Sequence, residues 1–560
     1  MARKPNKRAS KFKRKEPNNY QDLEAMSLED KGPKNYGKRK GGNAEAWYTR
    51  IRGISDPFSN LNWTYLQGLG VDYGSYTYQG TKYGINAKSL PGICAIPIAP
   101  VLGEASSASS PVNVAAMQMY SFVRHAVSGG KNYDPIDMIQ YIYGMSNTYA
   151  WINYLERAYR YYDLWSDVNR YVPITLLKAM GVEPNSVIDN PEAVRGQINF
   201  LISKAAAFAV PADMSIFERQ AFLFQEVYIE GASMRDQLYL FKPAGYYTYN
   251  EIGTVTAKTP ALQWNPITGV HTIQELINYA SSIIDSLLEA QSIGNISGDI
   301  KNAYGSNLIK LRYLEVGEKA SPIYDAAVLE QIQNATSLRL YDVELGTSSI
   351  GGVIIGDINQ NPGTAETANI NYLSQNISMG TPEEYPSGSV VTKPLIQSYL
   401  QLFTLDRLLL SQNEKPTSAT VLENTRLMVC SKVKGSTAQV LSGTEICGPV
   451  ELYTTTPTGG YKTPLIYTTL MVNSGSDTGF AGVECSAQSL NSLLETLAPF
   501  HYAPNLMVIN NLGNASTTTV SNYAKLSNYT LLHNSELEEL HKACIMSEFY
   551  VASIGSVSIG

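Results

Sequence analysis

The stretch DPIDMIQYIYGMSNTYAWINYLERAYRYYDLW, residues 134–165, decides how this chain folds. Asp134 followed by Pro135 favours a helix start, because aspartate caps the first backbone N–H groups and proline already has a helical φ angle. The apolar residues that follow, among them Ile139 and Trp151, do not keep to one stripe. A helix that is apolar all round is buried on all sides, so we expect this one inside a domain or between subunits.

Helix-start signals recur on both sides of this segment. Ser110 followed by Pro111 starts a helix that two glycines, residues 129–130, bring to an end. Four further helices are expected: over 173–180, from Pro191 to a stop before Pro211, over 215–231, and after the capping box that Thr272 forms with Glu275. Ser535 and Glu538 form a second capping box, which predicts a closing helix through ELEELHKACIMSEFY.

The composition changes after about residue 335, where Thr, Ser, Gly and Val become more frequent. Short apolar runs between turn signals are typical of strands. Three such runs are predicted strands: RLMVCSKVKG (426–435), PVELYTTT (449–456) and PLIYTTLMVN (464–473). The order along the chain is helical, then β-rich, then helical again, so the predicted fold class is α+β and predominantly α-helical.

The first 109 residues differ in composition from the rest of the chain. Its opening 17 residues, MARKPNKRASKFKRKEP, contain eight Lys or Arg and one Glu. Like charges repel and large apolar residues are scarce, so we expect a disordered basic arm over 1–45. Residues 46–109 are rich in Gly, Tyr, Ser and Pro, which predicts an extended segment that wraps over something larger. The remaining parts are a helical domain (110–335), a β-rich domain (336–505) and a C-terminal segment (506–560).

The charge of the chain is divided unevenly. Through Gly42 there are 13 basic and five acidic residues, a net charge of +8. The whole chain carries −6, so the remainder carries −14. A basic arm on an acidic body needs a polyanion as its partner, and three are open: nucleic acid, an anionic membrane, and the acidic body of another copy.

Non-specific binding to RNA is the role that we predict for the arm. Flexible Lys and Arg side chains neutralise phosphates and release condensed counterions without reading bases. The predicted RNA-binding residues are Arg3, Lys4, Lys7, Arg8, Lys11, Lys13, Arg14, Lys15, Lys38, Arg39 and Lys40. If about eight phosphates are neutralised, the log–log salt slope of binding is about −6 to −7. A solvated tail that aids solubility and a nuclear import signal are the alternatives.

The rest of the composition indicates extensive self-association. Charged residues make up 16% of the chain, against about 25% in typical soluble proteins. Tyrosine is frequent, with 38 residues. Protein interfaces deplete charge and enrich aromatics in this way. A tyrosine-rich core is the alternative explanation.

No enzyme or cofactor site is predicted. DTG at 477–479 lacks the apolar strand that feeds an aspartic-protease loop, and TGGYKT at 458–463 departs from a phosphate loop at Tyr461. DINQNPGTAETA at 357–368 has Pro362 in place of the turn glycine of a calcium loop. We therefore expect no enzymatic activity, with adventitious calcium binding at a subunit contact left open.

The cysteines and histidines predict neither a disulfide framework nor a metal site. No two of the five cysteines show C-x-x-C spacing, and their odd number fits a reducing compartment: Cys94, Cys430, Cys447, Cys485 and Cys544. His533 and His541 lie eight residues apart, which is not the spacing of a helical metal pair. His541 is expected to be an ordinary surface or interface residue near Glu538. The sequence contains no visible secretory signal or transmembrane helix.

Several stretches resemble blocks of picobirnavirus capsid proteins, in the order of that family and over roughly residues 110 to 551. They are MQMYSFVRHAVSGGKNYDPIDMIQYIYGM (117–145), RYVPITLLKAMGV (170–182), SIFERQAFLF (215–224), SGDIKNAYG (297–305), SPIYDAAVLEQIQNAT (321–336) and NYTLLHNSELEELHKACIMSEFYV (528–551). The β-rich stretch from 340 to 500 is the least similar. The resemblance therefore depends on the number and order of the blocks.

The resemblance implies a virion shell protein around a segmented double-stranded RNA genome. It implies a mostly helical fold in which a shell domain and a projecting domain build a symmetric dimer, with dimers closing into a small icosahedral particle. The helices of 110–335 and the closing helix would form the shell, 336–505 the projecting domain, and 506–560 would return to the shell. The expected partners are other copies of the chain and genomic RNA, while contact with a host membrane during entry stays open.

The expected location is the virion, after assembly in the host cytoplasm. Some members of the family remove an N-terminal peptide by self-cleavage, but no bond in this sequence is assigned to that step. The alternative function is a nucleic-acid-binding nucleocapsid or scaffold that forms non-icosahedral assemblies.

Overall fold

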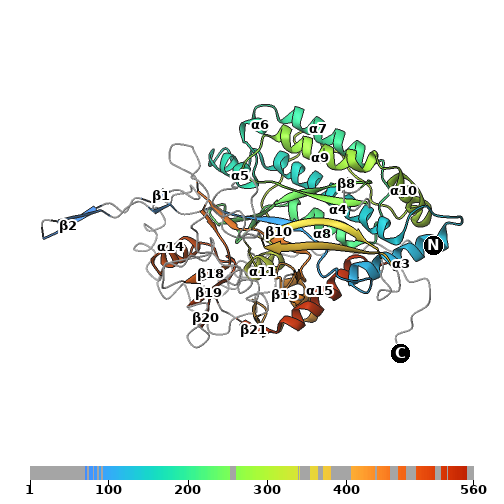
Figure 1. Ribbon diagram of the computed structural model, residues 1–560. Coiled ribbons are helices and arrows are strands. Elements are labelled where there is room, and N and C mark those ends of the chain that lie inside the picture. The colour runs from blue at the N-terminus through green and yellow to red at the C-terminus, as the bar shows by residue number, and fades with distance from the viewer. Residues whose placement is uncertain are drawn as a thin grey trace, which may run out of the picture. The chain divides into compact units, whose positions relative to one another are not determined.

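The computed structural model describes residues 92–252, 260–338, 340, 353–362, 370–379, 405–434, 438–454, 465–473, 487–510, 519–525 and 528–551, with short strands between 70 and 89 (Figure 1). The chain divides into two compact units, 1–64 and 65–560, and the described residues all belong to the second. The expected arm and most of the expected extended segment lie outside the described residues. The short strands form two antiparallel pairs: β1 (Gly70–Val71) with β4 (Lys88–Ser89), and β2 (Ser75–Tyr78) with β3 (Thr81–Gly84).

Helix α4 (Pro135–Tyr161) is buried on nearly all sides, which confirms the prediction from its sequence. Asp134 and Asp137 form a capping box at its start, in addition to the proline signal. Helices from both sides of it in the sequence pack against α4: α3 (Pro111–Ala126), α7 (Pro191–Ala205), α8 (Ser215–Gln225) and α9 (Ile273–Leu288). α7 and α9 also contact each other and lie side by side (Figure 1).

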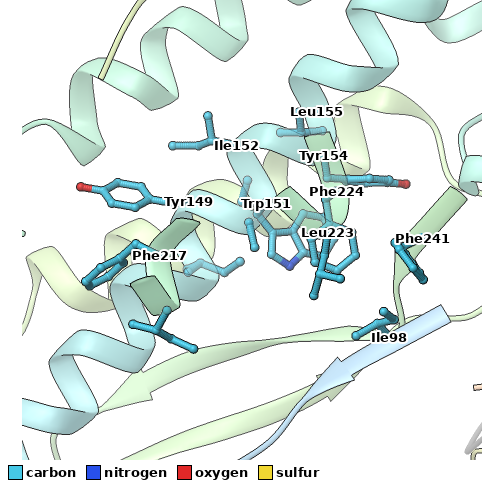
Figure 2. Packing of buried hydrophobic residues seen from close by; sticks show 14 of the residues in the cluster. Ile98, Tyr149, Trp151, Ile152, Tyr154, Leu155, Phe217, Leu223, Phe224 and Phe241 are labelled. Carbon is cyan, nitrogen blue, oxygen red and sulfur yellow. The ribbon is translucent and has the colours of Figure 1, made fainter. Parts of the chain in front are cut away.

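Aromatic side chains fill the space around α4. Trp151 is 2% exposed, and its ring centroid lies 5.5 Å from that of Tyr154. Figure 2 shows Tyr149 facing Phe217 and Tyr154 facing Phe224, with ring-centroid distances of 5.8 and 6.5 Å. Burying an apolar side chain of this size stabilises the fold by about 1.5–3 kcal/mol. Part of the high tyrosine content therefore belongs to the core.

The other predicted helices are present, with small shifts at their ends. α5 (Val172–Met180) ends where Gly181 has a φ of +88°, a left-handed value that favours glycine. Thr272 and Glu275 form the predicted capping box of α9. The helix expected over 215–231 ends at Gln225, as α8. Helices that the sequence did not predict are α6 (Asn185–Ile188), α10 (Gln291–Tyr304), α11 (Ala326–Asn334), α13 (Ser418–Asn424) and α14 (Ala487–Leu497).

The closing helix is α15 (Asn534–Glu548). The predicted capping box of Ser535 and Glu538 is wrong, because His533 caps this helix with Glu536 as its partner. The glutamate side chain accepts a hydrogen bond from the His533 backbone N–H at 2.9 Å. The helix consequently begins two residues earlier than the Ser535 cap implied.

One six-stranded sheet is built around β5 (Ile93–Pro100), a strand in which every residue is buried. Its neighbours in the sheet come from distant parts of the chain: β6 (Tyr228–Ile229), β7 (Leu238–Pro243), β15 (Glu445–Cys447), β16 (Val450–Tyr453) and β17 (Leu465–Tyr467). Pro97 lies between the part of β5 that pairs with β16 and the part that pairs with β15. Proline has no N–H to donate, so it fits where the neighbouring strand is interrupted. Gly448 at that interruption donates its N–H to the Pro97 carbonyl at 2.7 Å.

A second six-stranded sheet crosses the expected domain boundary at residue 335. Its order is β13 (Ser431–Lys434), β14 (Ala438–Leu441), β11 (Tyr372–Met379), β10 (Val353–Asn361), β9 (Ala261–Pro266) and β8 (Gly245–Asn250). The sequence did not predict β8 and β9, which lie in the part expected to be helical. Because β9 pairs with β10, the parts named 110–335 and 336–505 share one sheet.

The remaining strands form two small sheets. β12 (Arg407–Ser411) pairs with β21 (Asn528–Leu532), and β18 (Leu470–Asn473), β19 (Leu506–Asn510) and β20 (Thr519–Tyr523) form a three-stranded sheet. Of the predicted strands, 449–456 corresponds to β16, and only the end of 426–435 is a strand, β13. The stretch 464–473 is two strands, β17 and β18.

The fold is α+β with more helix than strand, as predicted. The largest hydrophobic core includes residues from Ile93 to Val551. Helices and sheets of the second unit therefore share a core. The five-part division of the chain stays a prediction, as does the assignment of shell and projecting parts.

Candidate functional site

The predicted RNA-binding residues, Arg3 to Lys40, lie outside the described residues. The structure therefore places none of these side chains, and their role stays a prediction. The same is true of the motifs at 458–463 and 477–479 and of Cys485.

The calcium-loop candidate at 357–368 is placed only in part. Its first residues, 357–361, are the end of β10, and Asp357 accepts a hydrogen bond from the Trp264 backbone N–H at 2.8 Å. That carboxylate is therefore engaged in the sheet. Among the residues with a described position, no group of three or more His, Cys, Asp or Glu could hold a metal ion. None of the described helices is both long enough and apolar enough to cross a membrane.

Two edge strands expose large apolar side chains. On β21, Tyr529 and Leu531 are each 59% exposed, and on β20, Val520 and Tyr523 are 43% and 39% exposed. Within the described residues, β21 pairs only with β12, and β20 only with β19. An edge strand presents unpaired N–H and C=O groups that can pair with another chain. We call these four residues the edge-strand surface; its chemistry fits a protein partner.

A groove of about 650 Å³ adjoins the edge-strand surface. It is lined by Val421, Leu531, Leu532, Leu540 and Ala543, together with Thr530, Ser535, Glu536 and Glu539. The groove is lined by residues of both β21 and α15, so the apolar surface extends from the strand to the helix.

A cluster of four charged side chains, called the charged centre below, lies between α8, α13, β15 and α15: Arg219, Arg426, Glu445 and Glu548. Glu445 is fully buried and accepts from Arg219 Nε at 3.2 Å and from Arg426 Nη2 at 3.4 Å. It also accepts from the Thr444 hydroxyl at 2.8 Å. Arg426 Nη2 donates to Glu548 Oε1 as well. One guanidinium group is therefore shared by two carboxylates.

The two carboxylates have different surroundings. Burial raises the pKa of Glu445, but the charges of Arg426 and Arg219 and the Thr444 hydrogen bond outweigh it, so that this pKa is lowered overall. Burial also dominates at Glu548, where Arg426 only partly opposes it and the Glu445 charge adds to it, so that the pKa is raised to about 7. No donor among the described residues reaches Glu548 Oε2.

The prediction that His541 is a surface or interface residue is wrong, since it is 1% exposed within the chain. Its Nδ1 lies 2.7 Å from the Ser442 hydroxyl, and its Nε2 lies 3.2 Å from the Thr425 carbonyl. Burial, and then the charge of Arg426, lowers the pKa of His541 to about 4. The apolar face of α15, directed into the fold by Leu537 and Ile545, carries this histidine inward.

A second groove, of about 840 Å³, lies beside the charged centre. Phe222 of α8 and Leu422 of α13 contribute apolar walls, and the exposed Glu218 and Glu423 also line it. None of the four residues of the charged centre was predicted from the sequence as part of a site. The available signal was a single charge inside an apolar run, as for Arg426 in TRLMVC and Glu548 in IMSEFYV.

The comparisons with known proteins agree with this fold. The X-ray crystallographic structure of the picobirnavirus capsid matches with a TM-score of 0.73 at 18% identity, covering 92% of this chain and 100% of that chain. The fold is thus that of a viral capsid protein. The family model described as the capsid protein of picobirnavirus matches residues 47–533, and the chain belongs to that family.

The chain is also similar in sequence to a protein from a named virus strain. The capsid protein precursor of Human picobirnavirus (strain Human/Thailand/Hy005102/-) is 26% identical over 529 residues, which are 92% of each chain. The resemblance seen in the separate sequence blocks is therefore confirmed. The protein is a structural protein of a virus particle.

Proposed function

We propose that this chain assembles with copies of itself into a closed icosahedral shell of symmetric dimers that encloses a segmented double-stranded RNA genome. The observation that carries self-assembly is the edge-strand surface, where Tyr529 and Leu531 are each 59% exposed on a strand with an unpaired edge in the described fold. A monomer that leaves such a strand open is prone to pair with other chains. The low charge content of the whole chain favours extensive contact between copies.

The arm is proposed to hold the RNA. The first 42 residues carry +8 and the rest of the chain carries −14, so the net charge of the arm attracts phosphates and that of the remainder repels them. Arg3, Lys4 and the other predicted cations would neutralise the RNA backbone without sequence preference. The acidic body would repel RNA outside the particle.

In this account the helices of 110–335 and α15 belong to the shell, and much of 336–505 belongs to the projecting part. Assembly takes place in the host cytoplasm, and the product is the virion. A nucleocapsid or scaffold that forms open assemblies is the alternative, and particle imaging distinguishes it by the absence of closed shells.

Deletion of residues 1–42 tests the function of the arm. The truncated protein is expected to form shells of the same diameter that contain much less nuclease-protected RNA, because the cationic phosphate ligands are gone. A second variant replaces all eight Lys and Arg of residues 1–17 by Gln, which keeps the length of the arm and brings the net charge of residues 1–42 from +8 to zero. An unchanged RNA content in both variants would show that the arm does not hold the genome.

A further inference from the structure

Strand β21 has an open edge, and the backbone groups that face it follow from the hydrogen bonds of its neighbour β12. Leu410 of β12 donates its N–H to Asn334 Oδ1 at 2.8 Å, and its carbonyl accepts from Asn334 Nδ2 at 2.9 Å. Leu410 pairs with Tyr529 of β21, so its backbone groups point away from that strand. In an antiparallel pair, opposite residues point their backbone groups either toward each other or away from each other. The N–H and C=O of Tyr529, and of Leu531 two residues on, consequently face the open edge.

The side chains of β21 divide between two faces. Tyr529 and Leu531 lie on one face and are each 59% exposed in a single copy. Thr530 and Leu532 lie on the other face, where Leu532 packs with Leu537 of α15 in a small hydrophobic cluster. A strand added at the open edge would therefore continue an apolar outer face and meet α15 on its inner face.

The groove beside this edge is acidic. Of the described residues that line it, Glu536 and Glu539 are charged, and no lysine or arginine is among them. Both glutamates are exposed, although Lys542 also pairs with Glu539. The whole of α15 contains four glutamates and one lysine, a net charge of −3. The inner face of an added strand should therefore carry positive charge together with apolar groups that contact Leu540 and Ala543.

The segment AWYTRIR, residues 46–52, has this pattern, and it lies outside the described residues. Trp, Tyr, Thr and Ile favour strands, and the segment contains no glycine or proline. Successive side chains of a strand point to opposite faces, so the segment would have an uncharged face and a basic face. These faces are Trp47, Thr49 and Ile51, and Tyr48, Arg50 and Arg52. The segment begins the stretch that the sequence predicts to be extended and to wrap over something larger.

We propose that residues 46–52 of a second copy add a strand to the open edge of β21, with the basic face over the groove. The two arginines pair with the glutamates of the groove and lay their apolar stems along its walls. Trp47 and Ile51 continue the outer face beside Tyr529 and Leu531 and cover it. The inference rests on the proposed function, since it names one contact through which copies assemble.

A second copy, rather than the same one, is the source of the segment. A segment from the same copy would close the edge of every isolated chain and leave no open strand for assembly, whereas in a single copy Tyr529 and Leu531 stay exposed. Gly70, the first residue of β1, lies 18 positions after Arg52. An extended chain of that length reaches about 60 Å, which is enough to place the segment on a neighbouring copy.

Disulfide trapping in assembled shells tests the pairing. Tyr529→Cys is combined in turn with a cysteine at each position from 47 to 52, and the shells are oxidised with copper phenanthroline. Directly opposite residues of two strands have Cα atoms about 4.5–5.5 Å apart, a separation that a disulfide spans. At least one of positions 47, 49 and 51 should lose most of its single-chain band to a species of twice the mass. Positions 48, 50 and 52 should not, because their side chains lie on the other face.

The matched control is Tyr313→Cys with the same six partners, since Tyr313 is 54% exposed but lies outside the strands. Shells that assemble normally and give no cross-linked dimer at any of the six positions would overturn the proposal and leave the proposed function standing. A cross-link that forms within one chain would also overturn it, because the segment would then lie on its own copy. A native protein that forms no shells would overturn the proposed function, and the pairing with it.

A peptide of residues 46–52 supplies a second readout on the native chain. Added during assembly, it should occupy the open edge of β21 and reduce the light scattering of the product. The control peptide has the same seven residues with the uncharged ones grouped at one end, which keeps the charge and removes the alternation. Equal inhibition by both peptides would show that charge alone acts on the groove, which would overturn the strand pairing.

Discussion

At the residue scale, the buried polar side chains of this protein are held by backbone carbonyls as well as by opposite charges. Arg157 of α4 is fully buried and donates to the carbonyls of Phe241 at 2.5 Å and of Glu226 at 3.3 Å. Its guanidinium carbon lies 5.6 Å from the ring centroid of Tyr154. Burial lowers the pKa of Arg157 to about 10, so it stays charged at neutral pH. One arginine thus links the central helix to the segment after α8 and to β7.

Arg157→Met removes this link while keeping much of the apolar stem. The free energy of unfolding should drop by about 2–4 kcal/mol, because buried carbonyls lose a charged donor. Urea unfolding followed by far-UV circular dichroism measures the loss. The control is Arg170→Met, since Arg170 also lies over a tyrosine ring but is exposed, and its effect should stay within about 0.5 kcal/mol. Equal losses in both variants would contradict the role given to Arg157.

At the element scale, the edge strands β20 and β21 combine exposed apolar side chains with an edge that is unpaired within the described fold. Leu409 and Leu532, from the paired strands β12 and β21, belong to a small hydrophobic cluster, which holds that pair in place. Tyr529 and Leu531 of β21 remain exposed. An edge strand that is fixed from one side and open on the other can add a further strand without refolding.

The double variant Tyr529→Lys and Leu531→Lys is expected to block assembly and leave the fold intact, because lysines on an edge strand oppose pairing with another chain. Light scattering measures the assembled mass, and circular dichroism checks the fold. The matched control is Tyr313→Lys and Val316→Lys, two residues that are 54% and 74% exposed but lie outside the strands. If both double variants assemble as the native chain does, the edge-strand surface is not an assembly contact.

The same elements show how far the sequence predicts the fold. Local signals were sufficient for α4, α5 and α9, where proline, glycine or a capping box marks an end. They failed for β8 and β9, which pair with each other, because this hairpin is held in its sheet by β10, about a hundred positions away, as Ile358 pairs with Leu262. The charged centre was missed for the same reason, since Arg219, Glu445 and Glu548 meet only in the folded chain.

At the scale of the whole molecule, a protein body that carries −14 is joined to a basic segment that carries +8. The body belongs to the picobirnavirus capsid protein family by sequence, and its fold matches a solved capsid. In the proposed function, self-assembly of the body and attraction of the arm to RNA use separate parts of the chain. The truncation and the edge-strand variants should therefore fail in different ways: the first loses RNA and keeps shells, and the second loses shells.

Electron microscopy of the purified full-length protein tests self-assembly most directly. The proposed function predicts closed shells of a single diameter that protect RNA from nuclease and show icosahedral symmetry after averaging. A stable monomer at high protein concentration, or irregular open complexes with RNA, would contradict it.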